Sequence, residues 1–232
     1  MDQNDYISFM RKNRKSEKTV SRHIRCLKVF ETYLSEEKQG KPLEEADPSD
    51  VRDFALWGDT ELKGVTLYIS AIKTFAEYLS YHELEMTENE LLGERYAARF
   101  LLKDFEGVAP EPVRKLASRG IQTATQMIAA GQTKEKRREL SEDLGVPMES
   151  VLELVKLSDL SRIPGLKSVR ARLYYEAGLD TVEKIARWEP GEMRSMLRGF
   201  IERTGFPGVA PLLKEAESTV ATAGHLPGIV EY

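Results

Sequence analysis

The sequence has one cysteine, three histidines and no long apolar run, and each shortage excludes a class of protein. A lone cysteine, Cys26, can form neither a disulfide nor a cysteine-based zinc site within one chain. No run of about 18 apolar residues is present, so we expect no membrane-spanning helix. The residues after Met1 are polar and acidic, unlike a secretory signal. These features predict a soluble, cytoplasmic protein that does not bind membranes.

Residues that usually carry catalysis are also scarce. His23, His82 and His225 have no partner at a spacing typical of a metal site or a catalytic triad. The sequence contains no glycine-rich phosphate loop, no His-Glu-x-x-His motif and no paired-carboxylate motif. We therefore expect a protein that is not an enzyme, that has no catalytic or metal-binding residues and that needs no cofactor.

The chain does have an ordinary apolar content and charges of both signs. Its 232 residues include 34 Lys and Arg and 38 Asp and Glu, for a net charge of −4, and 41% of them are hydrophobic. This length suits two small domains better than one. Apolar residues recur every three or four positions, and the alternating β-branched runs typical of strands are missing. The pattern predicts an all-α fold.

Capping residues and glycines place the helices of the first half. Ser16 can cap a helix that ends near Gly40, and Asp47, followed by Pro48, can cap a second one. A third helix is expected from about Thr66, which makes the start of a helical bundle.

Later boundaries in this half are marked more weakly. Gly58 and Gly64 are expected to bracket the turn before the third helix. A shorter helix is expected over residues 88–102. The first half is therefore predicted to be a bundle of four or five helices, in a domain that spans residues 1–98.

The second half contains an internal repeat. A shift of 58 residues superposes two glycines and a threonine on equivalent residues, and a shift of 60 aligns a third glycine. The aligned pairs are Gly107 with Gly165, Gly120 with Gly178, Thr123 with Thr181, and Gly145 with Gly205. We therefore predict two stacked helical units, at about 102–158 and 159–220, within a domain at 99–220. Residues 221–232 are expected to form a frayed tail.

The stretch from Ser16 to Met86 resembles the N-terminal core-binding, SAM-like domain of tyrosine recombinases and phage integrases. The segments Thr19–Arg25, Asp47–Val51 and Thr66–Leu79 carry the likeness. The resemblance implies a helical bundle that clamps one side of duplex DNA, with helix faces in the major groove. Recombinase cleavage needs a Tyr nucleophile within a cluster of Arg and His residues, and no His-x-x-Arg sequence occurs here.

The stretch from Asp104 to Glu217 is similar to tandem helix-hairpin-helix domains of an uncharacterised family. The likeness is clearest over Asp159–Ala171 and Ala177–Val182. In DNA-binding members, a Gly-apolar-Gly hairpin holds a phosphate through free backbone N–H groups. Here Lys167 and Ala109 replace the second glycine of the two hairpins. Lys167 could meet a phosphate through its ammonium group, whereas the first repeat is expected to be structural or protein-binding.

Charge is distributed unevenly along the chain. Residues 1–30 contain eight basic and three acidic side chains, and residues 31–61 contain three basic and ten acidic ones. On a helix over residues 18–34, apolar positions fall on one face and basic positions on the other. An ordinary solvated face would mix the two signs, but only Glu17 is acidic between Arg11 and Lys28. The predicted phosphate contacts are Arg14, Lys15, Lys18, Arg22 and Arg25.

Two further groups are candidates for phosphate contacts. The third helix is expected to present hydroxyl groups and lysines opposite an apolar face that includes Leu67. These candidates are Lys63, Thr66, Ser70 and Lys73, with Thr74 beside them. Lys167 and Arg170, at the second hairpin, are expected to form a second grip. The cluster of Lys134, Lys136, Arg137 and Arg138 has acidic neighbours and is expected to form surface salt bridges.

We therefore predict a non-catalytic protein that binds double-stranded DNA through backbone phosphates and associates with the nucleoid. Its expected role is in DNA recombination, integration or chromosome maintenance, with a protein partner possible at the helix-hairpin-helix repeats. Two alternatives stay open: a protein-interaction adaptor without DNA contact, which the acidic composition favours, and the DNA-binding fragment of a split recombinase. The sequence does not indicate the oligomeric state.

Overall fold

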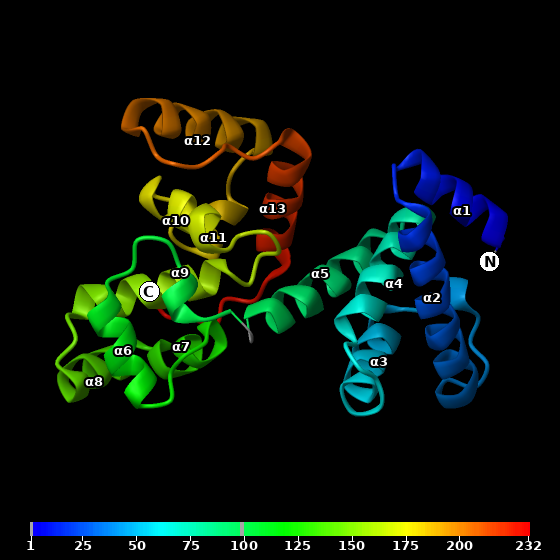
Figure 1. Ribbon diagram of the computed structural model, residues 1–232, viewed down its shortest axis with the longest axis horizontal. Helices are drawn as coiled ribbons and strands as arrows, with labels where there is room; N and C mark the ends of the chain where they lie inside the picture. The colour runs from blue at the N-terminus through cyan, green and yellow to red at the C-terminus, as the bar shows by residue number, and fades with distance from the viewer. Residues whose placement is uncertain (1, 98–99) are drawn as a thin grey trace. The chain divides into compact units, whose positions relative to one another are not determined.

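The computed structural model describes residues 2–97 and 100–232, with the backbone alone at 86, 89, 90, 94, 96 and 97. These residues form helices and no strand, apart from one isolated bridge between Leu101 and Thr123. The predicted all-α class is therefore confirmed. The chain divides into two compact units, residues 1–92 and 93–232, whose helices are labelled in Figure 1. The helix-hairpin-helix assignment of the second unit stays a prediction.

The first unit follows the predicted capping pattern. Its helices are α1 (Gln3–Lys12), α2 (Glu17–Glu37), η1 (Leu43–Glu45), α3 (Pro48–Glu61), α4 (Thr66–Leu79) and the start of α5 (His82–Ala97). The hydroxyl of Ser16 accepts the N–H of Thr19 and caps α2. The Asp47 side chain accepts the N–H of Asp50, whose carboxylate accepts the N–H of Asp47 in return. These predicted starts of α2 and α3, and that of α4 at Thr66, are confirmed.

The first residues form α1, a helix that the sequence did not predict. Tyr6 and Met10, one turn apart, are both fully buried. The ring of Tyr6 meets the ring of Phe75 edge-on, with centroids 5.6 Å apart. Two buried anchors are too few to establish a helical period. Because α1 packs against the bundle, Arg14 and Lys15 lie in the short connection between two packed helices, α1 and α2.

Two predicted boundaries in this unit are wrong. Gly58 does not mark a turn but is buried inside α3, where a Cβ atom would lie 2.5 Å from Cγ2 of Val65. The absence of a side chain therefore permits close packing of α3 against the start of α4. The following helix begins at His82 instead of near Glu88, because Ser80, in the left-handed conformation, already ends α4.

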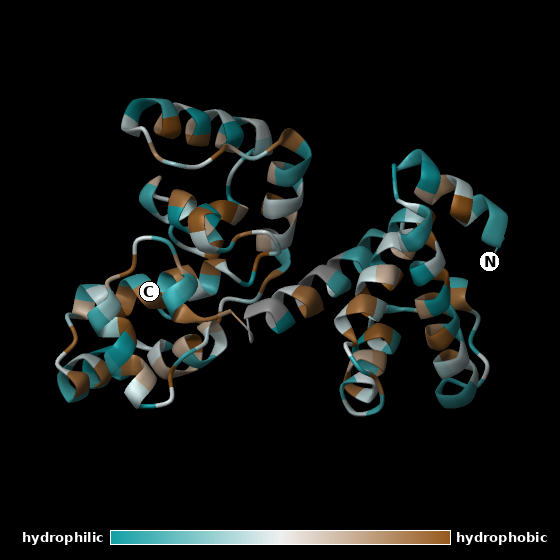
Figure 2. Ribbon diagram, in the orientation of Figure 1, coloured by the Kyte–Doolittle hydropathy of each residue, from teal (hydrophilic) through white to brown (hydrophobic). Residues whose placement is uncertain are grey.

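Aromatic rings join α2 to α3 in the core of the first unit. Phe30 lies 4.8 Å from Phe54 and Tyr33 lies 5.2 Å from Trp57, measured between ring centroids. Such ring pairs stabilise a core beyond the area that they bury. Figure 2 shows hydrophobic positions recurring along α2, α3 and α4 between hydrophilic ones. This packing fixes the rotation of α2 about its axis and thereby determines which of its side chains face solvent.

The first unit also buries an acid without a partner. Glu88 on α5 is fully buried, and neither of its carboxylate oxygens has a hydrogen-bond partner among the described residues. Burial raises the pKa of Glu88 well above its ordinary value of 4.5, against an opposing effect of Lys73. An acid whose pKa rises on folding binds its proton more tightly in the folded state. The stability that depends on this proton is therefore complete below pH 4.5 and is lost as the pH rises through the folded pKa.

We expect Glu88→Gln to remove this loss of stability. At pH 8 the substitution should raise the free energy of unfolding by about 1 kcal/mol or more, because a buried charge without a partner costs more than a buried neutral amide. Near pH 4 the variant and the wild type should be equally stable. Urea unfolding at the two pH values measures the difference. Glu31→Gln, at an exposed position on α2 and not among the charges that act on Glu88, is the control and should change neither value.

The second unit contains the same order of four helices twice. The first set is α6 (Pro110–Ser118), α7 (Ala124–Gly131), α8 (Lys134–Leu144) and α9 (Met148–Leu160), preceded by η2 (Leu102–Asp104). The second set is α10 (Ser168–Glu176), α11 (Val182–Ala186), α12 (Pro190–Thr204) and α13 (Leu213–His225). This order agrees with the internal repeat of the sequence.

Repeated residues have the same backbone role in both sets. The glycines of the repeat share the left-handed conformation, which costs least at glycine. The pairs are Gly107 with Gly165, Gly120 with Gly178, and Gly145 with Gly205. Thr123 and Thr181 cap α7 and α11 through their hydroxyl groups. The repeat therefore extends from the sequence to the local geometry.

Each repeat has its own hydrophobic cluster. Leu102, Leu116 and Met127 are fully buried in the first cluster, and Ile185 and Leu197 are fully buried in the second. Helix α9 contributes to both, because its middle residues lie in the first cluster and its last residue lies in the second. This shared helix ties the two repeats into one unit.

The end of the sequence is packed, so the predicted frayed tail is wrong. The hydroxyl of Tyr232 donates to Oδ2 of Asp159 over 2.9 Å. Arg162 donates to the carbonyl of Pro227, and Arg137 donates to the carbonyl of Glu231. These partners are separated by 65 to 94 positions in the sequence. No local pattern could have revealed them.

Arg137 also corrects the expected surface cluster at residues 134–138. Its side chain is buried, and its guanidinium donates to the carbonyl of Gly131 at the end of α7 over 2.8 Å. Lys134, Lys136 and Arg138 remain exposed. Arg137 is therefore a structural link between α7 and the end of the chain instead of part of a surface network.

Candidate nucleic-acid interface

The cations predicted on α2 and just before it face solvent. Arg14, Lys15, Lys18, Arg22 and Arg25 are all exposed, and none forms an ion pair within the described chain. The one nearby acid is already engaged, because Oε1 of Glu17 accepts a hydrogen bond from Nε of Arg11 over 2.7 Å. The Arg11–Glu17 pair was not predicted, although a six-residue separation across a capped turn could have suggested it. It leaves the other cations of this surface without a counter-charge.

Three cations line one groove between α2 and the start of α4. Arg22 and Arg25 come from α2, and Lys63 comes from the turn before α4. The groove has a volume of about 340 Å³, and its other lining residues are Cys26, Val29, Leu67 and Tyr68. We call these seven residues the cationic groove. None of the described residues that line it is acidic, so it suits a ligand with closely spaced negative charges.

The remaining candidates on α4 are less accessible than predicted. Thr66, Ser70 and Lys73 are half-buried and do not line the cationic groove. Thr74 is buried and donates its hydroxyl to the carbonyl of Ser70, so its placement on an exposed face is wrong. Leu67 is exposed, so the prediction that it belongs to the packed, apolar face of this helix is also wrong. Leu67 and Thr74 are seven positions apart and therefore lie on nearly the same face of α4. They differ because the middle of the helix is covered at Thr74, whereas its first turn opens to the groove at Leu67.

Two reactive side chains, Cys26 in the groove lining and His23 next to Arg22 in the sequence, are not available for chemistry. His23 is buried, and burial together with the charges of Arg22 and Lys15 lowers its pKa to about 4. Its ring is therefore neutral at physiological pH and adds no charge to the groove. Burial also raises the pKa of the Cys26 thiol, so this cysteine is a weak nucleophile.

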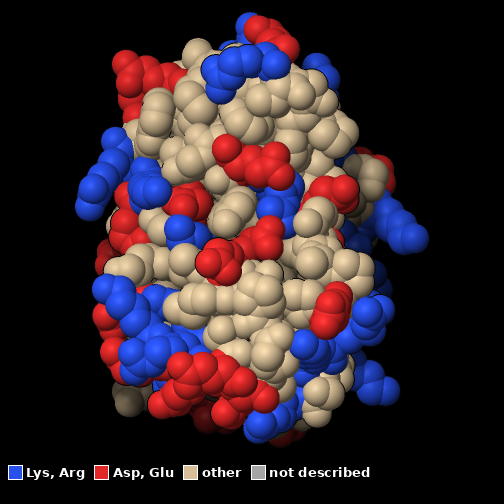
Figure 3. Space-filling view, turned by 90° about the vertical axis from the view of Figure 1, so that its left-hand side faces the viewer, with Lys and Arg blue, Asp and Glu red and all other residues tan. Residues whose placement is uncertain are grey.

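The two candidates of the second unit lie at the start of α10. Arg170 is half-buried and pairs with Glu215, with 3.2 Å between Nη1 and Oε1. Lys167 is half-buried, and burial lowers its pKa. On the face of the second unit in Figure 3, basic and acidic side chains lie beside one another. This unit therefore presents its cations with counter-charges nearby, in contrast to α2.

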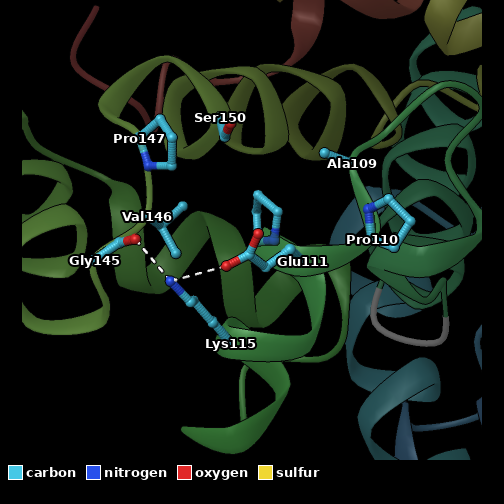
Figure 4. Close-up of a pocket in the computed structure, with 9 residues that line it drawn as sticks. Ala109, Pro110, Glu111, Lys115, Gly145, Val146, Pro147 and Ser150 are labelled. Atoms are coloured by element: carbon cyan, nitrogen blue, oxygen red, sulfur yellow. Dashed lines mark hydrogen bonds and ion pairs between the residues drawn. The ribbon is translucent and has the colours of Figure 1, made fainter.

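A second hollow lies in the first repeat of the second unit (Figure 4). Its volume is about 520 Å³, and much of its wall is proline, alanine and valine from α6 and the turn before α9. The ammonium of Lys115 donates to the carbonyl of Gly145 over 2.9 Å and lies 3.3 Å from Oε1 of Glu111. Because its one cation is engaged, this hollow suits an apolar group better than a phosphate.

Within the described residues, no group of His, Cys, Asp and Glu side chains is arranged to hold a metal ion. None of the helices described combines the length and the apolar character that crossing a bilayer requires. The prediction that the protein is not an enzyme stays a prediction.

Comparisons with known proteins divide the chain in the same way as its fold. The model of the phage integrase N-terminal SAM-like domain matches residues 4–82, so the predicted core-binding resemblance is confirmed. This match includes α1, which begins earlier than the resemblance recognised in the sequence. The model of a domain of unknown function, DUF4332, matches residues 106–226, more than half of the chain. No curated protein and no solved structure matches the chain.

Proposed function

Since the chain belongs to the DUF4332 family and begins with a phage integrase N-terminal SAM-like domain, we propose that it is a non-catalytic DNA-binding protein. The cationic groove holds the phosphates of duplex DNA, and Lys18, Lys15 and Arg14 extend the contact along the backbone. The protein serves DNA recombination, integration or chromosome maintenance.

The observation that carries this proposal is the uncompensated charge of the cationic groove. Arg22, Arg25 and Lys63 line it together, and no acid lies among its lining residues. Cations that serve only solubility are usually interspersed with acids. Phosphates spaced along a duplex are the polyanion that such a surface fits, and contacts to them dominate the affinity of most DNA-binding proteins.

The second unit has a different proposed role. Its Arg170 is paired with Glu215, and the hollow beside Lys115 is mainly apolar. These features favour a protein partner for the DUF4332 region, which would be brought to DNA by the first unit. A protein-interaction adaptor without any DNA contact is the second candidate function, and the acidic net charge of −4 favours it.

Binding of the full chain to a fluorescently labelled duplex separates the two candidates. We expect the affinity, measured by fluorescence anisotropy, to fall as salt rises. If the three groove cations each contact one phosphate, they alone account for a loss of about 40-fold between about 50 and about 200 mM salt, and contacts by Lys18, Lys15 and Arg14 make the loss larger. An adaptor would leave the anisotropy unchanged at the lower salt concentration, and this result would contradict the proposed function.

A further inference from the structure

The cationic groove contains an exposed leucine. Leu67, on the first turn of α4, is 49% exposed, although Ile69 and Ile72 of the same helix are fully buried. Single exposed leucines are common on protein surfaces and need no explanation by themselves. Leu56, on α3, is one of them at 69% exposed. Leu67 differs from Leu56 because it lines the groove that Arg22 and Arg25 also line.

The other lining residues limit what the groove can recognise. Apart from the three cations and the Tyr68 hydroxyl, every side chain that lines it is apolar or a thiol. It therefore has no amide to pair with adenine and no carboxylate to accept a hydrogen bond from cytosine, and its arginines and lysine, which could pair with guanine, are assigned to phosphates in the proposed function. In the major groove of DNA, thymine is distinguished by its 5-methyl group, which apolar side chains contact. An exposed leucine among phosphate-binding cations is placed for that contact.

We infer that Leu67 contacts the 5-methyl group of thymine when duplex DNA occupies the cationic groove. This inference rests on the proposed function and deepens it, because it gives the groove a preference among sequences. The cations bind the backbone and supply most of the affinity. Leu67 adds a smaller, base-dependent contribution, because the methyl group leaves water when it meets the leucine side chain.

The test compares two duplexes that differ only in this methyl group. One is a labelled alternating A·T duplex, in which every binding register offers thymine, and the other has uracil at every thymine position. The wild-type chain should bind the thymine duplex about three- to fourfold more tightly, as expected for burial of one methyl group. Leu67→Ala should bind both duplexes equally, with the salt dependence of the wild type. Leu56→Ala, the matched exposed leucine outside the groove, should keep the thymine preference.

The outcomes distinguish this inference from the proposed function. Equal binding of the two duplexes by the wild type would overturn the inference and leave DNA binding standing. A thymine preference that survives in Leu67→Ala would overturn the role of this residue. Failure of the wild type to bind either duplex at about 50 mM salt would contradict the proposed function itself. Because Leu67 is exposed, its truncation should leave the thermal unfolding curve unchanged, which circular dichroism checks.

Discussion

Arg22→Glu combined with Arg25→Glu should weaken duplex binding about 100-fold or more at low salt. Both side chains line the cationic groove and lack an ion pair among the described residues, so each is free to contact phosphate. A hydrogen bond to a charged group contributes about 1.5–3 kcal/mol, and two lost bonds account for this factor. Repulsion by the new carboxylates adds to it. The slope of log affinity against log salt should become shallower by about two units.

The control for this double substitution has the same change in net charge elsewhere. Arg138→Glu with Lys214→Glu replaces two exposed cations of the second unit. It should retain most of the affinity, because only the long-range field changes, and salt screens that field. Equal losses in the two double variants would show that net charge governs binding and would contradict a specific role for the cationic groove.

Arg162→Ala should destabilise the second unit by about 3–5 kcal/mol, the range for breaking a buried ion pair. Nη1 of Arg162 lies 2.7 Å from Oδ1 of Asp159, and the two side chains are only 6% and 2% exposed. The same guanidinium donates to the carbonyl of Pro227. Burial raises the pKa of Asp159, and Arg162 opposes this shift. Removal of Arg162 leaves the carboxylate buried, and among the described residues Tyr232 is then the side chain that still donates a hydrogen bond to it.

Urea unfolding followed by the fluorescence of Trp188 measures this loss, in a Trp57→Phe background that removes the other tryptophan. The double variant Arg162→Met with Asp159→Leu is the control. It should recover much of the stability, because no unpaired charge stays buried. Equal destabilisation by the single and the double variant would show that packing around Arg162, and not the unpaired charge, is responsible.

Local signals in the sequence predicted much of the fold. Ser16, Asp47 and Thr123 each precede a helix, and capping depends on residues only two or three positions apart. The glycine pairs of the repeat were visible for the same reason. Contacts between distant residues were not visible. Arg137 looked like a surface cation, yet it is buried against a carbonyl 94 positions away.

The cationic groove was predicted in part. The basic side of α2 followed from the helical period, because α2 is long and its apolar positions fall on one face. The nearness of Lys63 to Arg22 and Arg25 depends on how α4 packs against α2, which a single sequence does not specify. The same packing decides that α4 is covered at Thr74 but open to the groove at Leu67. A helical wheel of α4 places these two residues on nearly the same face, so it could not show that one is buried and the other exposed.

Lysine acetylation in the presence and absence of duplex DNA tests most directly whether the first unit holds DNA. Mass spectrometry of the full chain reports each lysine separately. DNA should protect Lys18 and Lys63, which are exposed on α2 and in the turn before α4. Lys136 and Lys214, exposed on the second unit, should react equally with and without DNA. Protection confined to the second unit, or absent from all four lysines while DNA is bound, would contradict the assignment of the cationic groove as the DNA-binding surface.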